Sequence, residues 1–170
     1  MTLLTVLSYL SENINAMIAT FFTAMTPIGE LRASIPLALG VYKLDIYSTI
    51  IISIIGNMIP AVVIVYALEP ISRFLMHRFK LMDRFFTWLF DRTRRRYYKR
   101  FEKYSGFALT FFVGIPLPIT GAWTGAIIAF VFGIPPKKAL LDIFLGLLLA
   151  AAIVTTIYKT IGYVAFITVG

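Results

Sequence analysis

The fold of this chain is decided by two polar stretches that interrupt a hydrophobic sequence: TPIGELRASIP at residues 26–36 and PLPITGAWTG at residues 116–125. Each stretch is followed by a weakly hydrophobic run, a glycine and then a long hydrophobic segment, so the two halves look like variants of one unit. Interruptions at matched positions in the two halves of a membrane chain indicate a transport site. We expect the helices to break at Pro27, Pro36, Pro116, Pro118, Gly121 and Gly125.

The composition is that of an integral membrane protein. Hydrophobic residues make up 59% of the 170 residues and charged residues 14%, with a mean hydropathy of +0.87, whereas soluble domains carry about 25% charged residues. The chain has no cysteine and a single histidine, His77. Disulfides and thiolate metal sites are therefore excluded, and a catalytic triad or zinc centre lacks its usual residues. We expect no metal and no cofactor.

Two segments are long and apolar enough to cross a membrane. Residues 46–68 are 23 residues without a charge, which at about 1.5 Å per residue spans a hydrocarbon core about 30 Å thick. Residues 139–158 form the second predicted transmembrane helix, with Asp142 and Lys159 near its ends, where we expect them to be interfacial.

The positive charge is concentrated between these segments. The formal net charge is +8, and 11 of the 16 Lys and Arg residues lie in residues 73–103. By the positive-inside rule the connector, residues 69–105, is cytoplasmic. Its aromatic and basic residues alternate at helical spacing, which predicts an amphipathic helix on anionic lipid. The charge is thus explained by membrane lipids as partners, and no nucleic acid is expected.

The segments around the two breaks are too short to span, so each is predicted to be a re-entrant hairpin, at about residues 14–43 and 106–136. The first enters from the outer face and the second from the cytoplasmic face. The predicted fold is all-α: an N-terminal helix, hairpin and transmembrane helix in residues 1–68, the connector, and an inverted repeat of hairpin, transmembrane helix and apolar tail in residues 106–170. Aligning Pro27 with Pro118 places Glu30 opposite Gly121 and Ser34 opposite Gly125.

Glu30 and Arg32 are the strongest candidates for function. An ionisable side chain inside a membrane segment costs about 2.5 to 3.5 kcal/mol on insertion scales and is a functional candidate by default. In one interpretation the two side chains pair with each other and only hold the shape of the hairpin. In the other, Arg32 binds an anionic group and Glu30 exchanges a proton.

Other polar residues near the breaks complete the candidate site. Asn57 is either a cavity residue or a helix-to-helix hydrogen bond, and Gly121 and Gly125 are either a packing seam or part of the site. The full set of candidate substrate- or ion-binding residues is Glu30, Arg32, Ser34, Asn57, Thr120, Trp123 and Thr124. The sequence has no nucleophile elbow, phosphate-binding glycine loop or metal-binding histidine pair, so no enzymatic activity is expected.

The two motifs ELRASIP at residues 30–36 and LPITGAWTGA at residues 117–126 resemble the small multidrug export protein family, over about residues 25–150. That family is distantly similar to the DedA and VTT-domain membrane proteins, which are linked to translocation of lipid or undecaprenyl phosphate. The resemblance implies a small transporter in a prokaryotic inner or cytoplasmic membrane, with Glu30 and Arg32 in the first motif. DedA proteins carry further acidic and arginine residues near their second hairpin, where this chain has Trp123 and Thr124.

Three functions remain open from the sequence. The first is a transporter or exporter of small amphipathic compounds, coupled to a proton or another cation. The second is a flippase or scramblase of an anionic lipid, either a phospholipid or a polyprenyl phosphate. The third is a membrane scaffold without transport. Because two hairpins and two spans enclose little space, we expect a homodimer.

Overall fold

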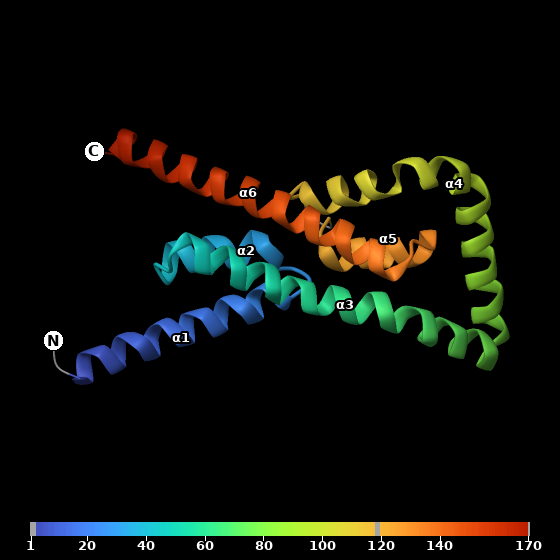
Figure 1. Ribbon diagram of the computed structural model, residues 1–170, viewed down its shortest axis with the longest axis horizontal. Coiled ribbons are helices and arrows are strands. Elements are labelled where there is room, and N and C mark those ends of the chain that lie inside the picture. The colour runs from blue at the N-terminus through green and yellow to red at the C-terminus, as the bar shows by residue number, and fades with distance from the viewer. Residues whose placement is uncertain (1–2, 118–119, 170) are drawn as a thin grey trace. The chain divides into compact units, whose positions relative to one another are not determined.

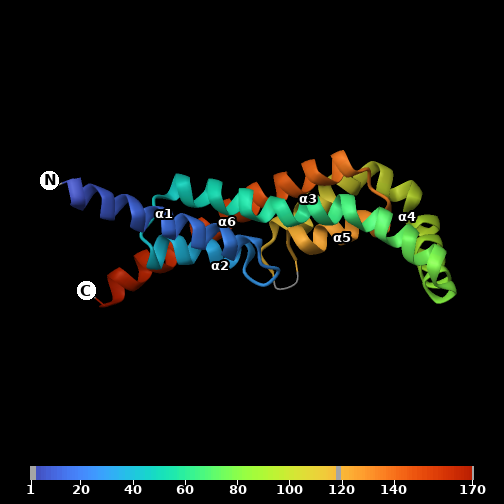
Figure 2. The same ribbon diagram turned by 90° about the horizontal axis from the view of Figure 1, so that it is seen from below.

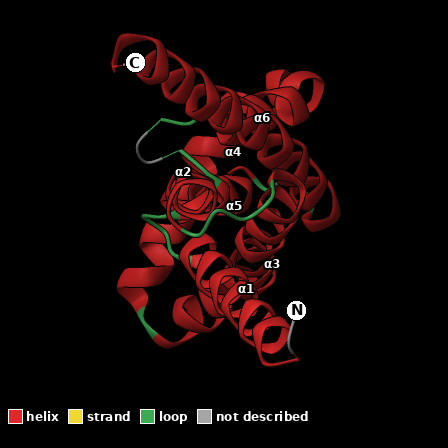
Figure 3. Ribbon diagram, turned by 90° about the vertical axis from the view of Figure 1, so that its left-hand side faces the viewer, coloured by secondary structure: helices red, strands yellow, loops and turns green. Residues whose placement is uncertain are grey.

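The computed structural model describes residues 3–117 and 120–169, with side chains at 13–93, 107–117 and 120–162. Every element in these residues is helical (Figures 1 and 3). The elements are α1 (Leu3–Met25), α2 (Glu30–Pro36), the π-helix η1 (Leu37–Val41), α3 (Ile46–Arg78), α4 (Lys80–Gly114), α5 (Ala122–Phe132) and α6 (Pro136–Val169). The chain divides into unit 1, residues 1–59 and 148–170, and unit 2, residues 60–147. Helices α3 and α6 contribute to both, and each unit is described by itself.

Helix α3 is polar on its buried face and apolar on its exposed face. Thr49, Ser53 and Asn57 are each 0% exposed. The exposed side carries large hydrophobic residues: Tyr47, Ile51, Ile55, Ile59, Val62, Val63 and Tyr66. In water this arrangement would be unfavourable, but in lipid the apolar face meets hydrocarbon and the small polar residues meet other helices. Among the described residues, α3 and residues 136–162 of α6 are long and apolar enough to cross a membrane.

The helices are longer than the sequence predicts. Helix α1 is continuous over 23 residues, so the expected N-terminal helix and the first arm of the hairpin are one element. Helix α3 continues to Arg78, past the expected end at residue 68, and α4 joins the connector to the first arm of the second hairpin. Helix α6 includes the expected C-terminal tail. The charged residues of the connector also favour helix. A helix therefore continues where the sequence changes from apolar to charged.

The first hairpin turns at residues 26–29. Pro27 lies in this turn, between α1 and α2, which contact each other side by side (Figure 2). Pro36 differs from the prediction, because it does not interrupt the helical path: it is the last residue of α2, and η1 follows directly. The π-helical bond from the Tyr42 amide to the Leu37 carbonyl, 3.2 Å, shows the wider turn, a common local response to a disturbed hydrogen-bond ladder.

The second hairpin turns between α4 and α5, at residues 115–121. Pro116 lies in this loop, and Pro118 lies outside the described residues. Gly121, with φ 155° and ψ −168°, ends the loop in a conformation that is nearly specific to glycine. Gly133 then ends α5 in the left-handed conformation, and the Ile134 amide donates to the Ala129 carbonyl at 2.9 Å.

One glycine in α3 and one glycine in α6 each mark a close contact with another helix. A Cβ at Gly56 of α3 would lie 2.6 Å from the Phe21 carbonyl oxygen and 3.1 Å from the Ala24 Cβ of α1. A Cβ at Gly146 of α6 would lie 2.8 Å from the Thr110 carbonyl oxygen and 2.7 Å from the Val113 Cβ of α4. In both places the glycine meets a backbone oxygen and the side chain three residues later.

Candidate functional site

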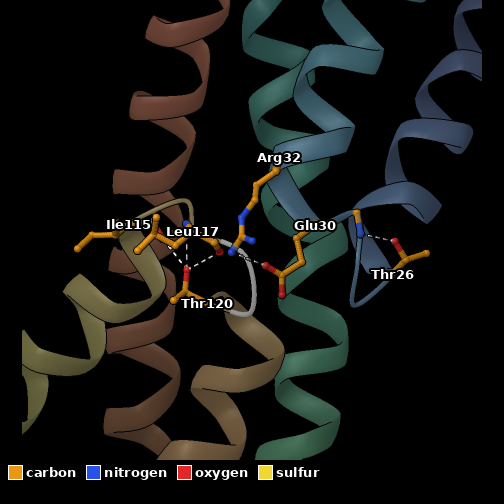
Figure 4. Close-up of polar contacts among 7 residues, drawn as sticks. Thr26, Glu30, Arg32, Ile115, Leu117 and Thr120 are labelled. Carbon is orange, nitrogen blue, oxygen red and sulfur yellow. Dashed lines mark hydrogen bonds and ion pairs between the residues drawn. The ribbon is translucent and has the colours of Figure 1, made fainter.

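Glu30 and Arg32 lie at the start of α2, directly after the first turn. The Glu30 side chain is 8% exposed and that of Arg32 is 26% exposed, and Arg32 Nη2 lies 3.8 Å from Glu30 Oε2 (Figure 4). Residues two apart do not share a face of a regular helix. Glu30 is left-handed, with φ 42°, and this departure from helical geometry accompanies the ion pair. A left-handed non-glycine residue costs about 1–3 kcal/mol and is often found at functional sites.

The turn before Glu30 is fixed by short hydrogen bonds. The Thr26 hydroxyl donates to the Thr23 carbonyl at 2.8 Å and accepts from the Gly29 amide at 3.0 Å (Figure 4). The Glu30 amide donates to the Thr26 carbonyl at 3.2 Å. A Cβ at Gly29 would lie 2.6 Å from the Thr23 carbonyl oxygen. Glycine is therefore required for the turn that places the charged pair.

Helix α3 brings two further polar residues to the same part of unit 1. The Ser34 hydroxyl donates to the Ser53 hydroxyl at 2.9 Å, and both residues are fully buried. The chain reverses at residues 42–45, so α2 and α3 run antiparallel (Figure 1). Glu30 lies one helical turn before Ser34 in α2, and Asn57 lies one turn after Ser53 in α3. Because the two helices are antiparallel, both steps lead in the same direction. We call Glu30, Arg32, Ser34, Ser53 and Asn57 the unit 1 polar site.

Asn57 is the most unusual member of this site. It is 0% exposed, and neither its Oδ1 nor its Nδ2 atom has a hydrogen-bond partner. Pro60, three residues later, has no N–H to donate to the carbonyl of Gly56. A buried polar group without a partner costs about 1–3 kcal/mol, so Asn57 destabilises the fold as it stands. The sequence singled out Glu30, Arg32, Ser34 and Asn57 but not Ser53, whose role depends on its contact with Ser34.

The other predicted residues, Thr120, Trp123 and Thr124, belong to unit 2. The Thr120 hydroxyl donates to the Ile115 carbonyl at 2.7 Å and accepts from the Leu117 amide at 3.1 Å (Figure 4). These bonds hold the loop between α4 and α5 in shape. Trp123 and Thr124 are half-buried in the first turn of α5.

Asp142 of unit 2, which the sequence predicts near the end of a transmembrane helix, is buried among the helices of the structure. Its exposed fraction is 6%, and its Oδ2 atom has no hydrogen-bond partner. The Thr110 hydroxyl of α4 donates to the Asp142 backbone carbonyl at 3.1 Å. A signal was present in the sequence: Asp142, Gly146 and Ala150 recur every four residues and share one face of α6.

Unit 2 also contains a pocket of about 360 Å³ between α3, α4, α5 and residues 133–136. Its walls include Met76 and the edge-to-face pair Phe90 and Phe130, and Glu69 and Arg73 form an ion pair of 2.6 Å at its exposed side. No predicted site residue lines it. Among the residues searched, no three His, Asp or Glu side chains come together as a metal site.

These features define an all-helical membrane protein with a buried polar site beside a broken helix. The chain belongs to the family described as "Putative small multi-drug export protein", whose model matches residues 30–153. The match begins at Glu30, directly after the first turn, and covers the loop between α4 and α5, and the family is one of exporters by its description and not of enzymes. Searches of curated proteins and of solved structures found no match.

Proposed function

We propose that this protein transports small amphipathic compounds across the membrane and that the unit 1 polar site binds both the cargo and a coupling proton. The family description supports transport of small compounds. The observation that carries the proposal is the ion pair between the buried Glu30 and the half-buried Arg32, held on a strained backbone at a helix break. The unpartnered amide of Asn57 adds hydrogen-bonding capacity for a polar group of the cargo.

The charges suggest how proton and cargo are coupled. While Glu30 is ionised, it neutralises Arg32, because their atoms approach to 3.8 Å. A proton on Glu30 removes this neutralisation, and the guanidinium then favours an anionic group of the cargo. Proton and cargo thus strengthen each other's binding, and by linkage the effect is reciprocal.

The two matched glycine contacts support an inverted repeat of hairpin and long helix. Positions 56 and 146 are 90 apart, close to the offset of 91 that aligns Pro27 with Pro118. With the offset of 90 that aligns Gly56 with Gly146, Asn57 corresponds to Leu147 and Ser53 to Ile143, so the polar site belongs to one half only. We further propose that both hairpins are re-entrant, that residues 69–105 are cytoplasmic in a prokaryotic inner or cytoplasmic membrane, and that two copies form a homodimer.

Binding of an amphipathic anion tests the proposal. The probe is 8-anilino-1-naphthalenesulfonate, titrated by fluorescence against protein in lipid nanodiscs at several pH values. We expect wild-type affinity to rise as the pH falls, Glu30→Gln to bind tightly at every pH, and Arg32→Ala to lose about tenfold in affinity, as for a charged hydrogen bond. Arg73→Ala is the matched control, since Arg73 is 77% exposed in its ion pair with Glu69. The proposal fails if Arg32→Ala and Glu30→Gln both behave like the control.

Flux measurements in proteoliposomes distinguish the other functions. Movement of the probe and of protons, lost in Glu30→Gln, supports the transporter. Translocation of phospholipid headgroups that Arg32→Ala abolishes, with no movement of the probe, would instead identify a lipid flippase like those linked to DedA proteins. If neither variant changes any flux, the protein is a scaffold.

A further inference from the structure

We infer that Asp142 is a second proton-binding site, separate from Glu30 and located in α6 of unit 2. The carboxyl group is 6% exposed, and Oδ2 has no hydrogen-bond partner. The Thr110 hydroxyl donates to the backbone carbonyl of Asp142 and so does not stabilise the carboxylate. In the ionised form, Oδ2 lacks the donor that normally compensates its loss of water.

The surroundings of Asp142 are apolar. Helix α4 meets this face of α6 through Thr110 and Val113, while Gly125 of α5 faces the neighbouring Ile143. Residues 107–114 of α4 and 122–132 of α5 contain no ionisable side chain. Lys137 and Lys138 at the start of α6 are the nearest charges along the helix, with Lys138 one turn before Asp142, while Glu69 and Arg73 of α3 are paired with each other.

The position of Asp142 gives it access to protons from one side. It lies six residues after Pro136, where α6 begins, a depth of about 9 Å at 1.5 Å per residue. Hydronium transfers a proton to Oδ2 and leaves as water, which neutralises the carboxylate, and the reverse step restores the charge. The neutral acid suits the apolar surroundings, and the carboxylate is favoured by the positive charge of Lys138. The link of this step to transport rests on the proposed function, but proton binding does not.

Infrared difference spectroscopy measures proton binding without any cargo. The protein in lipid nanodiscs is titrated with acid while the C=O stretch of protonated carboxylic acids is followed. We expect Asp142→Asn to lose the contribution of one buried carboxyl, and Asp142→Glu to keep it at a shifted frequency. Asp45→Asn and Asp83→Asn are matched controls, because both carboxylates are exposed, and Glu30→Gln is expected to remove a different contribution.

The inference is overturned if the spectrum of folded Asp142→Asn matches that of the wild type. Folding is checked by the thermal unfolding of each variant, and Asp142→Glu keeps the test decisive if Asn does not fold. Failure of the proposed transport function has a separate signature: the probe would not bind or move in the wild type, while the infrared signal of Asp142 would still be present.

Discussion

Replacing Asn57 by leucine is expected to make the protein more stable and inactive. Leucine has the same branching as asparagine but no polar atoms. Asn57 is fully buried, and both of its side-chain polar atoms lack partners. Each unsatisfied buried group costs about 1–3 kcal/mol, so we expect a gain of at least about 1 kcal/mol. For a chain of this size that corresponds to a rise in Tm of about 2–4 °C per kcal/mol.

The assay is thermal unfolding followed by the intrinsic fluorescence of the two tryptophans, together with binding of 8-anilino-1-naphthalenesulfonate. Leu147, which corresponds to Asn57 in the repeat that we propose, is 1% exposed. The converse variant, Leu147→Asn, is the control and is expected to lower Tm. If Asn57→Leu lowers Tm instead, the amide is satisfied in the folded protein and the reasoning about the unit 1 polar site is wrong.

Three further sets of substitutions test the rest of the structure, all by thermal unfolding. Gly56→Ala and Gly146→Ala each introduce a Cβ within 2.8 Å of another helix and are expected to cost about 1–3 kcal/mol of stability through overpacking. Gly162→Ala is the control and is expected to stabilise the protein, because nothing lies within 4 Å of the added Cβ. Equal effects at the three sites would contradict the close helix contacts. Thr120→Val removes the hydrogen bonds of the loop between α4 and α5 and is expected to cost about 1 kcal/mol, with Thr120→Ser close to wild type. Asp45 accepts a hydrogen bond from the Ser48 amide at the start of α3, which holds the pKa of Asp45 below its usual value of 3.8. The ionised carboxylate therefore stabilises the fold above pH 3.8, and this stabilisation is lost as the pH falls below that value. Asp45→Asn is expected to lower Tm at pH 7 and to remove this part of the acid dependence of stability.

The sequence alone determined the class of the protein and the breaks at Pro27 and Pro116. The breaks expected at Pro36 and Gly125 are wrong, because η1 follows Pro36 directly and Gly125 lies within α5. Hydropathy is a property of consecutive residues, so the membrane character of residues 46–68 and 139–158 was evident from composition and length. The turn at Pro27 and the loop at Pro116 were evident for a similar local reason, because proline lacks the amide hydrogen that a helix interior needs. The length of α4 was not evident, since charged and apolar segments both favour helix and no residue in between ends it.

Only the tertiary structure decided which polar residues are buried together. The bond between Ser34 and Ser53 joins positions 19 residues apart on two helices, and both residues are fully buried. Asp142 is buried because α4 and α5 cover its face of α6, which its place near the end of a hydrophobic run does not show. Burial depends on contacts between distant segments, and such contacts leave no local pattern in the order of the residues.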